Sequence, residues 1–111
     1  GVPLADAILL TTDVQAVPRY QNGPNFEQLV GRTKFCRTWG DCFGYYLVAT
    51  GKADLMLDPI LNPWDIMALV PVLRGSGATI TDWFGGNPAK GKSCIASNSD
   101  LHESVVKLLN Q

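Results

Sequence analysis

Apolar residues fall into short runs typical of buried strands and into longer segments with helical spacing. Strand-like runs occur at 5–12, 34–38, 53–57, 78–83 and 93–97, and helical patterns occur at 25–32, 42–50, 63–74 and 99–109. Short apolar runs bounded by turn residues indicate strands, and apolar residues three or four apart indicate amphipathic helices. Strands that alternate with helices of this length predict β-α-β crossovers and a sheet covered by helices. The predicted fold class is therefore α/β, in one domain.

Capping and turn residues mark several element boundaries. Asp41 stands at the N-cap position of the helix at 42–50, and Asn62 stands at the same position before Pro63. Proline suits the first helical position because its missing N–H would have no intrahelical partner there. The Gly-Ser-Gly at 75–77 ends that helix, and the segment 13–24, which holds two prolines, is predicted to be a loop.

Composition excludes several classes of protein. The 111 residues are 46% apolar and 17% charged, with a formal net charge of -1, which is typical of a globular domain rather than a disordered chain or a nucleic-acid binder. The longest apolar run, around 66–73, is too short for a membrane span. Three cysteines without a C-x-x-C pair argue against a zinc site or a disulfide framework. A reducing, cytoplasmic environment is the expectation, although a processed organellar protein would have the same features.

Asp65 has two interpretations. With Asn62 as N-cap, it occupies the third helical position, where a carboxylate can bond the N–H of the cap and interact favourably with the helix dipole. A carboxylate at the start of a helix is also a hard oxygen ligand of the kind that Mg²⁺ prefers. The pattern alone favours the cap.

Asp41 and Asp58 are ambiguous in the same way. Asp41 follows Gly40, and a glycine would let a ligand approach the backbone closely, but an N-cap is the better interpretation of the pattern. Asp58 ends a predicted strand, in the zone where open α/β sheets bind their ligands. A turn before Pro59 would explain Asp58 equally well.

Residues 37–83 resemble the C-terminal half of the inositol monophosphatase superfamily, and their details resemble its histidinol-phosphate phosphatase branch. The shared elements are "WGD" (39–41), "LVATGKAD" (47–54), "NPWDIMAL" (62–69) and "GATITDW" (77–83), in the order and spacing of the family. The resemblance implies the C-terminal α/β domain of a sugar-phosphatase fold. It also implies a Mg²⁺-dependent phosphomonoesterase, in which a metal-activated water attacks the phosphate ester.

The resemblance assigns roles to individual residues. Asp65 falls on the metal ligand of the family's W-D motif, and one carboxylate could both bind a metal and cap the helix through different oxygens. Gly40 and Asp41 match the substrate-contacting loop, and Asp58 matches the acidic substrate contact seven residues before the metal ligand. These acids suit the cationic amine of histidinol phosphate, whereas the inositol branch carries a small neutral residue at the position of Asp41.

Two residues next to these motifs, and one in the last helix, are also considered. Arg37 and Thr38 immediately precede the substrate-contacting loop and could face the pocket, although a solvated strand end explains Arg37 equally well. His102 is expected to be a solvent-facing residue of the last helix.

The family's remaining metal ligands are not present in these 111 residues. They lie on an upstream glutamate pair and a D-P-[IL]-D-G-T motif, and the "DPILN" at 58–62 is no substitute because Leu61 stands where the second aspartate is required. One carboxylate should bind Mg²⁺ weakly, since this ion holds its water shell tightly. Hydrolysis also needs metal ions that activate a water and bind the phosphoryl oxygens, and one carboxylate cannot hold such an assembly. The chain alone is therefore expected to be inactive, as the C-terminal domain of a longer phosphatase whose N-terminal metal-binding half is absent.

Several alternatives stay open at this point. Within the same class, inositol monophosphatase-type activity on another small phosphate ester would use the same motifs. A different class, a non-catalytic α/β binding or assembly module, would explain the incomplete active site. The expected partners are a small-molecule phosphate ester and the missing N-terminal half, and an exposed sheet edge could also support a homodimer.

Overall fold

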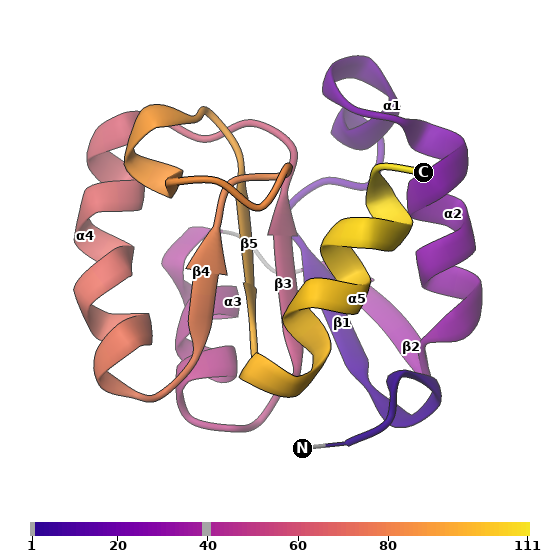
Figure 1. The fold of residues 1–111 in the computed structure, drawn as a ribbon, viewed down its shortest axis with the longest axis horizontal. Coiled ribbons are helices and arrows are strands. Elements are labelled where there is room, and N and C mark those ends of the chain that lie inside the picture. Colours follow the sequence, from indigo (N-terminus) through magenta and orange to yellow (C-terminus); the bar gives the residue numbers. More distant parts are fainter. Residues whose placement is uncertain (1, 39–40) are drawn as a thin grey trace.

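The structure, a computed structural model, describes residues 2–38 and 41–111, without the side chains of residues 41–43 and 63. It is a five-stranded mixed sheet between two layers of helices, which confirms the α/β class (Figure 1). The strands are β1 (Ile8–Thr11), β2 (Phe35–Thr38), β3 (Leu55–Asp58), β4 (Thr79–Thr81) and β5 (Cys94–Ser97). The helices are α1 (Ala16–Tyr20), α2 (Gly23–Arg32), α3 (Asp41–Ala49), α4 (Pro63–Gly75) and α5 (Ser99–Leu109), with two 3₁₀ turns, η1 (Leu4–Asp6) and η2 (Pro88–Lys90).

The sheet has the strand order β2-β1-β3-β5-β4. β1 pairs in parallel with both β2 and β3, as the expected crossovers require. β5 is antiparallel to β3 and to β4, and here the expectation of β-α-β crossovers does not hold. The segment between β4 and β5 contains only the short turn η2, and a connection of this kind can return the chain antiparallel without a crossover helix.

Each face of the sheet has its own hydrophobic core. Leu9, Leu55, Leu57 and Ile95 point to the face covered by α1, α2 and α5. Leu10, Met56, Ile80 and Ala96 point to the face covered by α3 and α4. Figure 1 shows α5 in front of the sheet and α3 behind it. Because successive strand residues point to opposite faces, strands buried on both sides appear in the sequence as continuous apolar runs.

The segment expected to be a loop contains α1. Val17 of α1 is fully buried in the core, and its burial stabilises a helix that the two nearby prolines had argued against. Pro18 lies in the first turn of α1, where proline is tolerated. The following helix begins at Gly23, and the side chain of Asn22 caps it by accepting a hydrogen bond from the N–H of Asn25.

Helix α3 packs tightly on the sheet at Gly44, against the side chain of Met56. A Cβ atom at this position would lie 2.5 Å from Sδ of Met56 and 2.8 Å from its Cε. Glycine in a helix interior normally costs stability, so its presence here reflects the close approach of α3 to β3.

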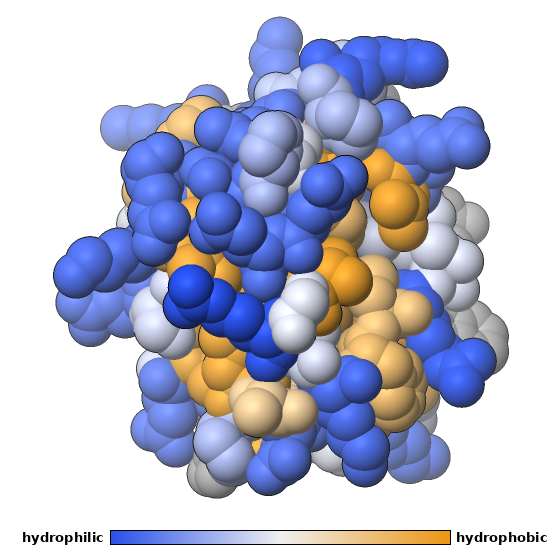
Figure 2. All heavy atoms as spheres, turned by 90° about the vertical axis from the view of Figure 1, so that its right-hand side faces the viewer, coloured by the Kyte–Doolittle hydropathy of each residue, from blue (hydrophilic) through white to orange (hydrophobic). Residues whose placement is uncertain are grey.

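The sheet ends at β2 on the side that Figure 2 presents. Hydrophilic side chains surround separate apolar patches on this face, which carries α2 and β2. Among the described residues, β2 pairs only with β1, so its outer backbone groups have no strand partner. Within the same part of the chain, no helix is long and apolar enough to cross a lipid bilayer.

Candidate active site

The candidate site lies at the carboxyl ends of the three parallel strands. Thr11 at the end of β1 is in register with Thr38 of β2 and with Leu57 of β3, so these strand ends are adjacent. The chain passes from β3 into α4 and from β2 towards α3, so both helices begin at this edge. Ligands of open α/β sheets bind outside the carboxyl ends of the strands.

Asp65 lies in the first turn of α4 and is half-buried. Its backbone N–H donates to the carbonyl of Asn62 at 3.1 Å, as in a normal first turn. The side chain of Asn62 makes no capping bond, and no hydrogen bond to the Asp65 carboxylate occurs among the described residues. The capping-box interpretation is therefore not supported, and the carboxylate oxygens are not used by the helix start.

Asp58 is the last residue of β3 and is only 3% exposed. Its Oδ2 accepts a hydrogen bond from the hydroxyl of Tyr45 at 2.5 Å, and its Cα is in register with that of Cys94. The sequence suggested a turn before Pro59 as an alternative role for Asp58. In the structure, its carboxylate also joins β3 to α3 through the hydrogen bond with Tyr45. A ligand could reach Asp58 only through the small surface left at the end of the strand.

Burial controls the protonation of the groups around Asp58. Desolvation, together with the charge of Asp58, raises the pKa of Tyr45 well above its usual value. Desolvation also raises the pKa of the Cys94 thiol to about 12, although a hydrogen bond with Tyr45 lowers it. Both groups are therefore neutral near pH 7, and neither is a nucleophile there.

Arg37 and Thr38 are both exposed at the end of β2. Since neighbouring strand residues alternate, they point to opposite faces of the sheet, and only Arg37 shares the face of Asp58. The Arg37 guanidinium lies 5.0 Å from the centre of the Phe35 ring. The predicted contact at Gly40 and the side chain of Asp41 lie outside the described residues.

Two polar side chains at this edge were missed by the sequence interpretation. Tyr45 stands in the apolar run "FGYYLVA" and reads there as a core residue. Thr11 closes the apolar run of β1, and its buried Oγ1 has no hydrogen-bond partner among the described residues. The place of Thr11 at the end of an apolar strand is a local signal that could have indicated it, whereas no local signal distinguishes Tyr45 from a core residue of its helix.

His102 is buried, with 6% exposure, and its expected position facing solvent is wrong. Its Nδ1 lies 2.7 Å from Oγ of Ser97 and its Nε2 lies 2.8 Å from Oγ1 of Thr81. The ring therefore connects α5 to both β4 and β5. His102 is buried because α5 docks on the sheet, which brings the ring against Thr81 and Ser97.

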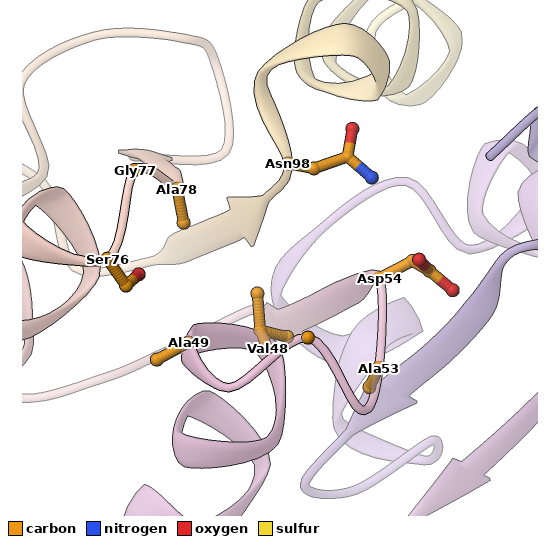
Figure 3. Close-up of a pocket in the computed structure, with 9 residues that line it drawn as sticks. Val48, Ala49, Ala53, Asp54, Ser76, Gly77, Ala78 and Asn98 are labelled. Carbon is orange, nitrogen blue, oxygen red and sulfur yellow. The ribbon is translucent and has the colours of Figure 1, made fainter. Parts of the chain in front are cut away.

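A hollow of about 230 Å³ lies at the opposite edge of the sheet, away from Asp58 (Figure 3). Its polar side chains already have structural partners: Asp54 accepts from the N–H of Ile8, Asn98 caps α5, and Ser76 donates to the carbonyl of Leu73. The remaining lining is made of small or apolar side chains and glycine. This hollow offers no group for chemistry, so the carboxyl edge is the better candidate.

The residues at the carboxyl edge fit a part of a metal site. Within the described part of the chain, no three His, Cys, Asp or Glu side chains lie close enough together to hold a metal ion. Mg²⁺ usually keeps several waters and takes only one or two protein carboxylates together with substrate oxygens. Asp65 would suit the role of one ligand of such an ion, and a site with three or more protein ligands would need residues outside the described set.

Comparison with known proteins identifies the family of this chain. The model of the inositol monophosphatase family matches residues 3–111. A histidinol-phosphatase from Mycobacterium tuberculosis is 38% identical over 74 residues, which cover 67% of this chain and 28% of that protein.

Two solved structures match almost the whole chain. An inositol monophosphatase from Zymomonas mobilis superposes with a TM-score of 0.88 at 26% identity and covers 99% of this chain and 45% of that one. An IMPase/NADP phosphatase complexed with NADP and Ca²⁺ superposes with a TM-score of 0.81 at 27% identity, with 98% and 42% covered. The chain thus spans less than half the length of each of these relatives. It belongs to the inositol monophosphatase family, whose relatives named here are phosphatases.

Proposed function

We propose that this chain is the C-terminal part of a Mg²⁺-dependent phosphomonoesterase that acts on histidinol phosphate. The observation that carries the proposal is the half-buried Asp65 carboxylate, which the helix start does not use and which lies at the ligand-binding edge of the sheet. Similarity to a histidinol-phosphatase supports the substrate, and the Ca²⁺ complex of a relative supports a divalent cation.

In this proposal, one carboxylate binds the metal ion and two others bind the amine of the substrate. Asp65 would supply one oxygen ligand, and the bound ion would activate a water and offset the charge of the phosphate. Asp41 and Asp58 would orient the cationic amine of the substrate, because a carboxylate pairs with an ammonium group where water is excluded. Gly40 would allow the ligand to approach the backbone, and exposed Arg37, on the face of Asp58, could contribute positive charge.

The rest of the active site is proposed to lie on an N-terminal half that these residues do not contain. The incomplete ligand set around Asp65 and the partial coverage of the relatives both support this proposal. The open edge at β2 offers a surface for that half or for a second copy of the chain. A cytoplasmic location is proposed on the reduced state expected of Cys36 and Cys94.

A substrate panel tests the proposal. The longer polypeptide would be assayed for phosphate release from L-histidinol phosphate, inositol 1-phosphate and NADP, with and without Mg²⁺. We expect Mg²⁺-dependent hydrolysis with the highest kcat/KM for histidinol phosphate. A preference for inositol 1-phosphate would favour the other branch, and no hydrolysis of any ester would favour a non-catalytic module.

A further inference from the structure

The buried contact between Tyr45 and Asp58 is the least expected polar feature of the candidate site. Tyr45 is 2% exposed and Asp58 is 3% exposed, and their side-chain oxygens are 2.5 Å apart. One residue lies in α3 and the other ends β3, so the hydrogen bond joins a helix to the strand on which it packs. The thiol of Cys94 interacts with the same phenol.

Stability alone does not explain why this polar pair is buried. Moving a carboxylate out of water is costly, and apolar residues of similar volume often stabilise a core as well as a buried polar pair does. A phenylalanine at position 45 with an apolar residue at position 58 would pack the same layer without that cost. The pair lies at the edge of the sheet where ligands bind, which points to a role in ligand binding.

The position of Tyr45 along α3 connects it to the second acid of the site. Tyr45 comes four residues after Asp41, which is one helical turn, and Asp41 is the first residue of α3. A rigid aromatic ring therefore links the helix turn that carries Asp41 to the strand end that carries Asp58. Because Asp58 exposes so little surface, the direction of its carboxylate decides whether its charge reaches a ligand at this edge of the sheet.

We propose that Tyr45 is a positioning residue whose hydroxyl orients the Asp58 carboxylate and thereby makes the site selective for phosphate esters that carry a cationic amine. The inference rests on the proposed function, since it concerns the same pocket. Tyr45 acts through Asp58 and touches no substrate itself.

The test compares two tyrosine variants on two substrates. In the longer polypeptide, Tyr45→Phe removes the hydroxyl and keeps the ring, and Tyr20→Phe makes the same change at a tyrosine that is 48% exposed on α1. The substrates are L-histidinol phosphate, which carries an amine, and p-nitrophenyl phosphate, which does not. For Tyr45→Phe, we expect kcat/KM for histidinol phosphate to fall about tenfold or more, mainly through KM, as when a hydrogen bond to a charged group is lost.

The second substrate separates positioning from a purely structural role. The kcat/KM for p-nitrophenyl phosphate should stay within about twofold in Tyr45→Phe, and Tyr20→Phe should leave both substrates unchanged. Equal losses on both substrates, or no loss on either, would overturn the inference about Tyr45. No turnover of histidinol phosphate by the unaltered enzyme would instead overturn the proposed function, and the selectivity with it.

A second variant, Asp58→Asn, keeps the inference testable if Tyr45→Phe folds poorly, and a double-mutant cycle adds to the test if both variants fold. Asp58→Asn keeps an acceptor for the phenol but removes the charge, and it should produce the same loss that is specific to the amine substrate. If Tyr45 acts through Asp58, adding Tyr45→Phe to Asp58→Asn should cause little further loss on histidinol phosphate. Fully additive losses would overturn the inference.

Discussion

At the residue scale, the sequence around Asp65 favours a helix-capping carboxylate, but the structure shows no capping hydrogen bond to it among the described residues. The third position of a helix is a favoured place for an acid that bonds the N–H of the cap. In α4, neither the Asn62 side chain nor the Asp65 carboxylate makes such a bond among the described residues. The free energy of unfolding should therefore depend little on this carboxylate, whereas the proposed metal binding should depend on it strongly.

Asp65→Asn tests this separation of roles. In the longer polypeptide, we expect kcat/KM to fall by at least roughly 100-fold, since even residues behind a metal ligand often contribute 10- to 100-fold. In the 111-residue chain, the free energy of unfolding in urea should change by less than about 0.5 kcal/mol. Glu103→Gln, at an exposed position of α5, is the isosteric control and should change neither quantity. A loss of stability of about 1 kcal/mol with full activity would restore the cap interpretation.

His102 makes the stability of the chain depend on pH. Burial lowers the pKa of its ring from 6.5 to about 4 in the folded chain, so the folded state favours the neutral ring. The resulting stabilisation is complete above pH 6.5 and is lost as the pH falls towards 4. Urea unfolding between about pH 7 and pH 4 should show a steeper loss of stability for the unaltered chain than for His102→Gln. Equal slopes would mean that His102 does not titrate with folding.

At the scale of elements, the packing of α3 on β3 determines the geometry of the candidate site. α3 begins at Asp41 and carries Tyr45, and Gly44 lies between them, against Met56 of β3. The Met56 side chain fills the space next to Gly44, so α3 packs directly on that side chain. The hydrogen bond between Tyr45 and Asp58 depends on that packing.

Gly44→Ala should therefore destabilise the chain although alanine favours helices. The added methyl group would overlap Sδ of Met56, and overpacking of this kind usually costs about 1–3 kcal/mol. Gly31→Ala in α2 is the matched control, because its added Cβ meets nothing within 4 Å and should stabilise the chain by about 0.5–1 kcal/mol. Urea unfolding of the two variants measures the difference. Equal stabilisation by both substitutions would show that α3 can move away from β3 without cost.

At the scale of the whole molecule, the described residues supply only a part of the proposed metal site. Within this part of the chain, Asp65 does not belong to a group of three or more metal-ligating side chains. Mg²⁺ gives up its waters reluctantly and binds weakly to a lone carboxylate. Assembly with further ligands is thus expected to be a condition for activity.

Calorimetric titration of the 111-residue chain with Mg²⁺ tests this expectation directly. We expect no saturable binding at concentrations below about a millimolar and no phosphate release from histidinol phosphate, because a single carboxylate cannot replace the hydration shell. The longer polypeptide should bind Mg²⁺ and hydrolyse the ester under the same conditions. Tight binding by the 111-residue chain would mean that its residues form a complete metal site.

The amino-acid sequence by itself determined the features that depend on neighbouring residues. The spacing of apolar positions predicted all five strands and four of the five α-helices, and α5 begins and ends as predicted at Ser99 and Leu109. The short helix α1 was missed because its stability comes from burying Val17 in the core, which no local pattern reports. The motifs also identified the family, since motif spacing is a property of the chain itself.

Only the tertiary structure decided what the polar residues of the site contact. Asp58, Tyr45 and Cys94 are up to 49 positions apart in the sequence, and the register between β3 and β5 together with the docking of α3 brings them together. The same holds for His102, which reaches Thr81 and Ser97 only when α5 lies on the sheet. Capping and periodicity are local and can be read along the chain, whereas burial and long-range hydrogen bonds exist only after the elements have packed.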